Sequence, residues 1–246
     1  MSLAFEELAY CETPLGPVSL RRRRVPMLDN QEIHEVKLGD EFLMSSLFHD
    51  VEVALADLGL ADREGPLDVV VGGLGLGYTA RAALRNPHVR SLLIVEALEP
   101  VIDWHRAGLV PLGPELTSDG RTQFVLGDFF ALATSPDDSF DPSDPRRTFD
   151  AVLLDIDHSP DNLLHPRHAA FYTAGALREF AKKLNHGGTF ALWSDDPPEK
   201  TFLSTLREVF AEVTTQVVTF PNPLRGTDSA STVYLAKRVT PSSANG

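Results

Sequence analysis

The sequence is poor in cysteine, since Cys11 is the only one among its 246 residues. A single cysteine excludes an internal disulfide framework and a cysteine-based metal site, and it is typical of a reducing compartment. Long apolar runs are also missing, because no stretch approaches the roughly 18 apolar residues of a membrane span. The first ten residues carry acids where a secretion signal needs a basic start. We therefore expect a cytoplasmic protein with no membrane partner.

Basic residues are scarce as well. There are 22 Lys and Arg residues against 35 Asp and Glu residues, for a formal net charge of -13. Such a charge disfavours a nucleic-acid partner and suits a neutral or cationic small substrate. The one basic run, Arg21 to Arg24, falls in an expected strand, where alternate side chains face opposite sides. It indicates a solvated or subunit-facing surface, and the second of these is compatible with a homodimer.

The N-terminal part shows β-type patterns followed by a helical one. Two short β-type pieces between Val18 and Lys37 are separated by "PMLDNQ", a plausible turn, and they predict a hairpin. From 44 to 60 the apolar residues recur at helical spacing, with Ser45 or Ser46 as the expected N-cap. A helix should therefore join the hairpin to the rest of the chain.

After this helix, apolar strands alternate with helical segments. The strands are "VVV", "SLLIVE", "TQFVLGD", "FDAVLLDID", "GGTFALWS" and "ASTVYLAKR". This alternation predicts an α/β fold with a doubly wound, mostly parallel sheet of the Rossmann-like kind and helices on both faces. We expect a hairpin and linking helix over 1–65, one large domain over 66–238, and a disordered tail over 239–246.

A glycine-rich turn follows the first strand of this domain. Its glycines are Gly72, Gly73, Gly75 and Gly77, and an alanine-rich helical segment comes next. Glycine allows the backbone to approach a ligand and exposes the N–H groups of a helix start. The spacing is not the dinucleotide pattern G-x-G-x-x-G, and a plain strand-to-helix turn would use the same glycines. Glu96 ends the next strand about 20 residues later, where an acid binds ribose hydroxyls, so the two features predict a nucleotide-type site.

Further acids follow the third and fourth strands. Asp128 is either a helix N-cap or a ligand for an adenine amino group. Asp155, Asp157 and His158 end the fourth strand, at the carboxyl edge where ligands of α/β sheets bind. We expect these three residues to be catalytic, while a turn or N-cap role is the alternative, chiefly for Asp157 and His158.

Residues after the fourth and fifth strands are candidates for binding a substrate. Tyr172 would line the acceptor side, and Trp193 with Asp195 would hold a cationic acceptor through ring-face and carboxylate contacts. A turn that caps the next helix is the alternative for the segment around Asp195. His165 and His168 belong to a loop and a helix start, and without a third ligand at suitable spacing no metal site is predicted.

The order of "VVVGGLGLG", "LLIVEALEPVIDWHR", "VLGDFF" and "FDAVLLDID" resembles the spermidine synthase-like (polyamine aminopropyltransferase) family of the class I S-adenosylmethionine-dependent methyltransferase fold. The resemblance covers roughly Thr13 to Arg238. It implies that 66–238 is a catalytic domain that binds an adenosyl sulfonium, either S-adenosylmethionine or decarboxylated S-adenosylmethionine. It also implies a glycine turn near the amino-acid tail of that cofactor, Glu96 on the ribose, Asp128 near the adenine and Asp155 facing the reacting amine.

Three departures from the family pattern concern the amine. The family reads G-G-G-D-G-G at the turn, where the Asp holds the amine of the decarboxylated cofactor, and here that slot is Gly75. The family reads D-S-S-D-P after the fourth strand, whereas this chain has "DIDHSPD", and its Y-x-E is replaced by "FHDVE", in which Phe48 lacks the hydroxyl. Loss of the acid at the turn relaxes the repulsion of a cofactor carboxylate.

The resemblance therefore implies a spermidine synthase-like transferase that aminopropylates a small amine in polyamine biosynthesis. Methyl transfer from intact S-adenosylmethionine is the alternative, and a non-catalytic cofactor-binding or assembly protein is a further one. In either transfer an alkylammonium acceptor arrives almost wholly protonated at neutral pH. A carboxylate that binds the ammonium and takes its proton is then needed, and Asp155 is the expected one, with Asp157 or His158 sharing the task.

Overall fold

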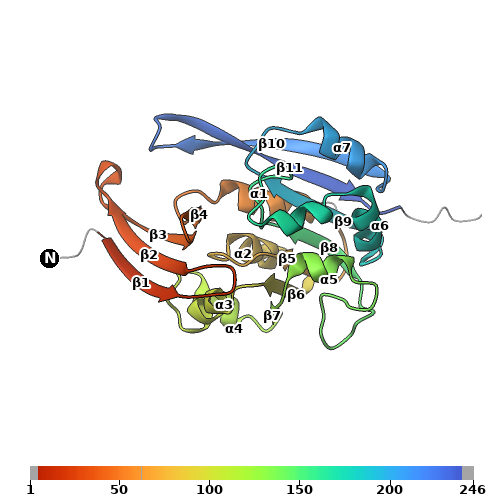
Figure 1. Cartoon of the computed structure of the whole chain (residues 1–246), viewed down its shortest axis with the longest axis horizontal. Coiled ribbons are helices and arrows are strands. Elements are labelled where there is room, and N and C mark those ends of the chain that lie inside the picture. Colours follow the sequence, from red (N-terminus) through yellow and green to blue (C-terminus); the bar gives the residue numbers. More distant parts are fainter. Residues whose placement is uncertain (1–4, 62, 240–246) are drawn as a thin grey trace, which may run out of the picture.

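The computed structural model describes residues 5–61 and 63–239, so all but the first residue of the tail expected over 239–246 lies outside the described residues. Two sheets form the molecule, a four-stranded antiparallel sheet from the N-terminal part and a seven-stranded, mostly parallel sheet (Figure 1). The larger sheet carries helices on both faces. The expected doubly wound α/β fold is confirmed.

The N-terminal sheet is larger than the expected hairpin. The hairpin itself is present as β2 (Val18–Val25) and β3 (Gln31–Leu38), and it gains a neighbour on each side, β1 (Phe5–Cys11) and β4 (Glu41–Ser45). Arginines of β2 form ion pairs with glutamates of β1 and β3, as Arg22 does with Glu6 and Arg23 with Glu35 at 2.8 Å. Cross-strand pairing thus places the basic run among acids on the surface of the sheet.

Helix α1 (Asp50–Gly59) begins later than the sequence predicted. Neither Ser45 nor Ser46 is its N-cap, because Ser45 ends β4 and pairs with Glu35 of β3. The N-cap residue is His49, whose side chain makes no capping hydrogen bond. The segment "FLMS" instead pairs with β3, the strand just before it in the chain, and this pairing overrides the helical spacing of its apolar residues.

The seven strands of the larger sheet follow the order β10-β11-β9-β8-β5-β6-β7. The pairs from β9 to β7 are parallel, whereas β10 and β11 form an antiparallel hairpin added at the β9 edge. The parallel strands are β5 (Leu67–Gly72), β6 (Val89–Glu96), β7 (Thr122–Leu126), β8 (Phe149–Leu154) and β9 (Leu184–Ser194). Sequence analysis identified β11 (Thr227–Lys237) but not β10 (Glu212–Asn222), whose side chains are mostly exposed or half-buried.

Alternate residues of the central strands pack into two cores, one on each face of the sheet. Val69 and Val71 of β5 join the core under α1 and α2, whereas Val70 joins an aromatic core with Phe180 and Phe190. This two-sided burial explains why the strands read as continuous apolar runs. The helices beyond α1 are α2 (Tyr78–Arg85), α3 (Glu99–Arg106), α4 (Gly113–Ser118), α5 (Phe129–Thr134), α6 (Ala174–Ala181) and α7 (Lys200–Arg207).

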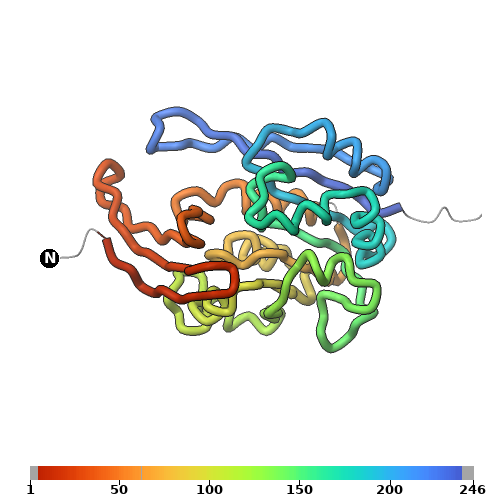
Figure 2. Tube along the Cα trace, in the orientation of Figure 1, coloured from red at the N-terminus to blue at the C-terminus, as the bar shows by residue number. Residues whose placement is uncertain are grey.

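The β10–β11 hairpin extends beyond the sheet, and its tip lies at the same end of the molecule as the N-terminal sheet (Figure 2). Phe220 of β10 meets Phe48, which precedes α1, with ring centroids 6.0 Å apart. The hairpin, the N-terminal sheet and the carboxyl ends of the parallel strands therefore surround a common space. Among the helices of residues 5–61 and 63–239, none has both the length and the apolar character needed to cross a membrane.

Candidate active site

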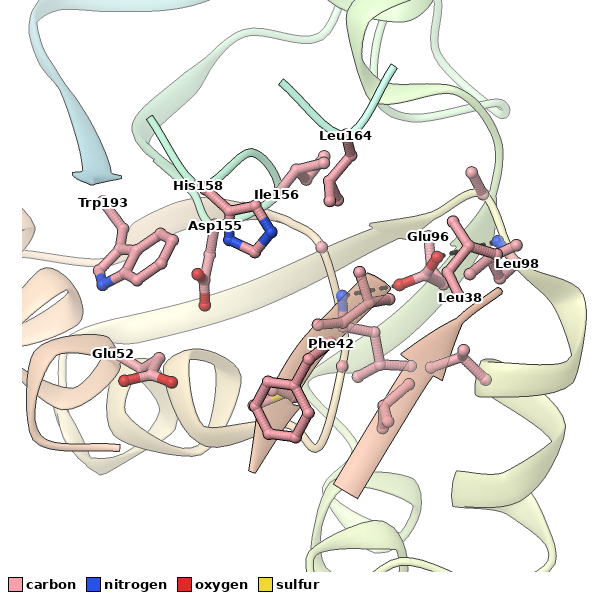
Figure 3. Close-up of a pocket in the computed structure, with 18 of the residues that line it drawn as sticks. Leu38, Phe42, Glu52, Glu96, Leu98, Asp155, Ile156, His158, Leu164 and Trp193 are labelled. Carbon is pink, nitrogen blue, oxygen red and sulfur yellow. Dashed lines mark hydrogen bonds between the residues drawn. The ribbon is translucent and has the colours of Figure 1, made fainter. Parts of the chain in front are cut away.

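A cavity of about 1010 Å³ lies where these three parts meet. Its walls come from β4, from the start of α1, from the segments that follow β5 to β9, and from the β10–β11 hairpin. Glu96 lies toward one end, and Glu52, Asp155 and Trp193 gather at the other (Figure 3). The volume is at the upper end of those of small-molecule sites and accommodates a nucleoside-sized ligand together with a small second molecule.

The glycine turn after β5 reaches this cavity through two of its four glycines. Gly73 and Gly75 line the cavity, with φ angles of 93° and 47°. A Cβ at Gly73 would overlap the backbone oxygen of Asp155, so only glycine fits there. Gly72 ends β5 and Gly77 is the N-cap of α2, so they shape the turn rather than line the cavity.

Glu96 at the end of β6 connects the glycine turn to the next loop. Its two carboxylate oxygens accept hydrogen bonds from the backbone N–H groups of Leu74 at 2.9 Å and Leu98 at 2.8 Å. Burial raises the pKa of Glu96, while these N–H donors oppose the shift. The carboxylate lines the cavity, where it can also accept from a ligand hydroxyl.

Asp128 lines the cavity and is also a helix cap. Its Oδ1 accepts from the backbone N–H groups of Phe130 at 2.9 Å and Ala131 at 3.2 Å, which makes it the N-cap of α5. The two alternatives from the sequence are therefore compatible, because capping uses one carboxylate oxygen and leaves the other for a ligand.

Asp155 follows β8 directly and points into the cavity (Figure 3). Its Oδ2 accepts a hydrogen bond from the hydroxyl of Thr79 in α2 at 2.7 Å. Burial raises the pKa of Asp155 to about 6, and the Thr79 hydrogen bond opposes this shift. A carboxyl group with a pKa near 6 can both hold and release a proton close to neutral pH.

Glu52 of α1 is a cavity residue to which sequence analysis gave no role, although it ends the segment "FHDVE". Its side chain lies at the same end of the cavity as Asp155 (Figure 3). Burial, followed by the charge of Asp155, raises the pKa of Glu52 well above its usual value. A signal was present in the sequence, because Glu52 precedes the buried residues Leu55, Ala56 and Gly59 by three, four and seven positions. An acid on the buried stripe of a helix indicates a functional position.

Asp157 and His158 lie in different surroundings. Asp157 is 3% exposed and does not line the cavity; its carboxylate accepts from the Leu164 N–H, His168 Nδ1 and the Tyr172 hydroxyl. His158 lines the cavity, and its Nε2 lies 3.0 Å from Oε1 of Glu41 in β4. The loop after β8 thus contacts the N-terminal sheet across the cavity.

The residues expected to bind the acceptor also lie in different places. Tyr172 packs among the aromatic side chains of the second core and binds Asp157, away from the cavity wall. Trp193 and Asp195 both line the cavity, close to Glu52. The Trp193 Nε1–H group is buried and has no hydrogen-bond partner within the described part of the chain, so it can donate to a ligand or a water.

Carboxyl groups outnumber guanidinium groups on the cavity wall. The acids are Glu12, Asp50, Glu52, Glu96, Glu99, Asp128, Asp155 and Asp195, and the arginines are Arg167 and Arg225. Field lines from one sign of charge concentrate in a cleft of this kind, so it attracts cations.

Residues 5–61 and 63–239 contain no group of three or more His, Cys, Asp or Glu side chains arranged to hold a metal ion.

Comparisons with known proteins were made for the whole chain, and no family model matches it. Curated polyamine aminopropyltransferases are similar in sequence. The chain is 28% identical over 183 residues to polyamine aminopropyltransferase 2 of Pseudomonas aeruginosa, a match that covers 72% of this chain and 48% of that protein. It is 26% identical over 195 residues to the enzyme of Sulfolobus acidocaldarius, with 75% and 57% covered. The chain therefore aligns with about half the length of these two relatives.

Solved structures of spermidine synthases have the same fold. One, a spermidine synthase in complex with the transition state analogue AdoDATO, superposes with a TM-score of 0.69 at 16% identity and covers 95% of this chain and 74% of its own. Another, from Thermotoga maritima, has a TM-score of 0.67 at 15% identity, with 94% and 72% covered. At such identities the superpositions establish the fold.

Proposed function

We propose that the chain, which is similar in sequence to polyamine aminopropyltransferases and in fold to spermidine synthases, is a transferase that uses an adenosyl sulfonium to aminopropylate a small cationic amine. The observation that carries the proposal is one cavity with two different ends. One end has the glycine turn and Glu96, and the other has Glu52, Asp155, Trp193 and Asp195. A cofactor and an amine would meet between them.

The residues present fit a cofactor of the adenosyl-sulfonium type. Gly73 and Gly75 line the cavity, so the backbone of the turn would contact the tail of the cofactor. Glu96 would accept from the ribose hydroxyls, and Asp128 would accept from the amino group of the adenine with the oxygen not used for capping. When bound, the sulfonium supplies an activated carbon, so the protein has to align a nucleophile with it.

The acceptor end would bind an ammonium and remove its proton. Asp155 is the proposed base, because its pKa of about 6 allows it to be ionised at neutral pH and to take a proton from a bound amine. The amine nitrogen then forms a bond to the carbon as the carbon–sulfur bond breaks, and the electron pair of that bond stays on sulfur. Glu52 and Asp195 would compensate the charge of a polyvalent amine, with His158 at the rim. Asp157 would support the loop rather than touch the amine.

One observation favours methyl transfer as the second candidate function. Gly75 stands where the aminopropyltransferase pattern has an acid, and Met44 of β4 occupies the space beside it. A thioether does not repel a carboxylate, so the tail of intact S-adenosylmethionine would be tolerated. The expected homodimer and cytoplasmic location remain predictions of the same proposal.

An assay of purified protein with each cofactor and a panel of mono-, di- and triamines tests the proposal. We expect a nucleoside thioether to be released and the amine to gain an aminopropyl group, both followed by mass spectrometry. A gain of one methyl group would instead establish the second candidate. Binding of both cofactors without turnover on any amine would mark a non-catalytic cofactor-binding protein.

A further inference from the structure

A histidine that sequence analysis assigned to a helix start lies at one corner of the cavity. His168 belongs to the 3-10 helix η2 (Pro166–Ala170), and its Nδ1 lies 2.7 Å from Oδ1 of Asp157. The Asp157 carboxylate also accepts from the Leu164 N–H at 2.9 Å and from the Tyr172 hydroxyl at 2.9 Å. Burial and the Asp157 charge raise the pKa of Tyr172 well above its usual value, so the tyrosine keeps its proton and donates.

These bonds determine which nitrogen of His168 carries the proton. An ionised carboxylate only accepts, so Nδ1 must donate, and in the neutral ring Nε2 then carries a lone pair. The His168 side chain is 17% exposed, against 1% for Asp157, and it lines the cavity. Within the described residues, Nε2 has no protein hydrogen-bond partner. This nitrogen is not buried. The acceptor nitrogen is therefore accessible from the cavity.

His168 lies at the corner of the cavity that also contains Asp128. The His168 ring stacks on Phe130 with centroids 4.0 Å apart and an interplanar angle of 29°. Phe130 in turn donates its backbone N–H to Asp128. Leu164, whose N–H binds Asp157, points its side chain into the cavity beside Ile156 (Figure 3). A carboxylate, an imidazole acceptor and apolar side chains thus share one end of the cavity, which suits the edge of a planar base that carries an amino group.

We propose that His168, oriented by Asp157, is a specificity-determining residue that accepts a hydrogen bond from the exocyclic amino group of the adenine. This inference rests on the proposed function, which assigns the adenine to the Asp128 corner. The amino group has two hydrogens, one for Asp128 and one for His168 Nε2. A 6-oxo purine presents a carbonyl oxygen to both acceptors instead, so the site rejects it. Asp157 acts as a positioning residue, because it selects the ring tautomer without touching the base.

Calorimetric titration with 5′-methylthioadenosine and with 5′-methylthioinosine, which differ only in the base, tests this assignment. We expect the wild-type protein to bind the adenosine at least about tenfold more tightly, since two acceptors lose their donor in the inosine complex. His168→Phe retains a ring on Phe130 but removes the acceptor. It should weaken adenosine binding by about three- to tenfold, the effect of one neutral hydrogen bond, and reduce the preference correspondingly.

A matched variant controls for damage to the cavity wall. His165→Phe changes another cavity histidine, whose Nδ1 accepts from the Arg167 N–H and which binds no carboxylate among the described residues, and it should leave the preference unchanged. Asp157→Ala should reduce the preference as His168→Phe does, although His168→Phe alone decides the question if the alanine variant does not fold. A wild-type preference retained by His168→Phe overturns the assignment. Failure of the wild-type protein to bind either nucleoside overturns the proposed function and the assignment with it.

Discussion

Met44 of β4 lies against Gly75 of the turn after β5, and its Sδ accepts a hydrogen bond from the backbone N–H of Leu76 at 2.9 Å. A Cβ at Gly75 would overlap this sulfur atom. The N-terminal sheet therefore packs against the glycine turn. With Met44 in this position, only glycine fits at position 75. The carboxylate that the aminopropyltransferase pattern has at this slot could enter only if Met44 moved.

A double-mutant cycle on this pair tests the dependence. Gly75→Asp should lower the free energy of unfolding by about 1–3 kcal/mol, because its φ of 47° is left-handed and the side chain collides with Met44. Met44→Ala in the same chain should recover at least about 1 kcal/mol of this loss, measured by urea unfolding. Gly39→Asp is the matched control, since Gly39 has a φ of 58° with open space around it. Purely additive effects of the two changes would contradict the dependence.

The same pair should set the choice between cofactors. We expect wild-type protein to bind intact S-adenosylmethionine at least as tightly as the decarboxylated form. Met44→Ala with Gly75→Asp should shift the preference toward the decarboxylated form by tenfold or more, which needs only about 1.4 kcal/mol of repulsion between two carboxylates. Paired dissociation constants at one salt concentration measure this. A strong wild-type preference for the decarboxylated form would mean that another acid, Asp155 or Asp195, holds its amine.

Glu96→Gln should weaken cofactor binding by about 1.5–3 kcal/mol, the scale of a charge-assisted hydrogen bond. The amide nitrogen would also face the N–H of Leu74 or Leu98, so some loss of stability is expected. Calorimetry alongside thermal unfolding separates the two effects. Glu99→Gln, an exposed acid on the same cavity wall, is the control and should leave binding nearly unchanged. Undiminished affinity in Glu96→Gln would remove the ribose assignment.

Asp155→Asn should lower turnover by about 10²–10⁴-fold, the usual contribution of a general base, and leave cofactor affinity within a few fold. In wild-type protein the rate should rise with pH through about 6, where Asp155 loses its proton. Steady-state kinetics across pH 5 to 8 measure both. Asp161→Asn, an exposed acid of the same loop, should behave as wild type. Equal losses of rate and cofactor affinity would make Asp155 part of the cofactor site instead.

The raised pKa of Asp155 also predicts how stability depends on pH. The folded protein holds this proton up to about pH 6, whereas the unfolded chain releases it near 3.8, so stability falls as pH rises between these values. Asp155→Asn removes that loss and should stabilise the fold at pH 8 by up to about 3 kcal/mol relative to wild type. The difference should shrink toward pH 4. Chemical unfolding at both values measures it, and a pH-independent difference would show that Asp155 is not buried as a charge.

The sequence by itself determined the parallel core of this protein and one end of its cavity. Continuous apolar strands ending in acids, with a glycine turn after the first of them, predict a doubly wound sheet, and the carboxyl ends of parallel strands meet at one edge. The positions of Gly73, Glu96, Asp128 and Asp155 on the cavity wall follow from that rule, because each lies next to the strand that carries it. Local pattern was sufficient wherever a residue and its supporting element are adjacent in the chain.

Only the tertiary structure decided the remainder. Strands β1, β4 and β10 each pair with a strand adjacent in the chain, but their side chains are mostly exposed or half-buried, so their sequences carry no strong local signal. Glu52 and Met44 enter the cavity because α1 packs on β8 and β9, and because the N-terminal sheet contacts the loops that follow β5 and β8. Asp157 follows the same strand as Asp155, yet it turns inward because His168, Tyr172 and Leu164 supply the donors that a buried carboxylate needs. These donors lie 7, 11 and 15 residues after Asp157, and the way the intervening loop folds back on it, which no short pattern encodes, separated these two acids.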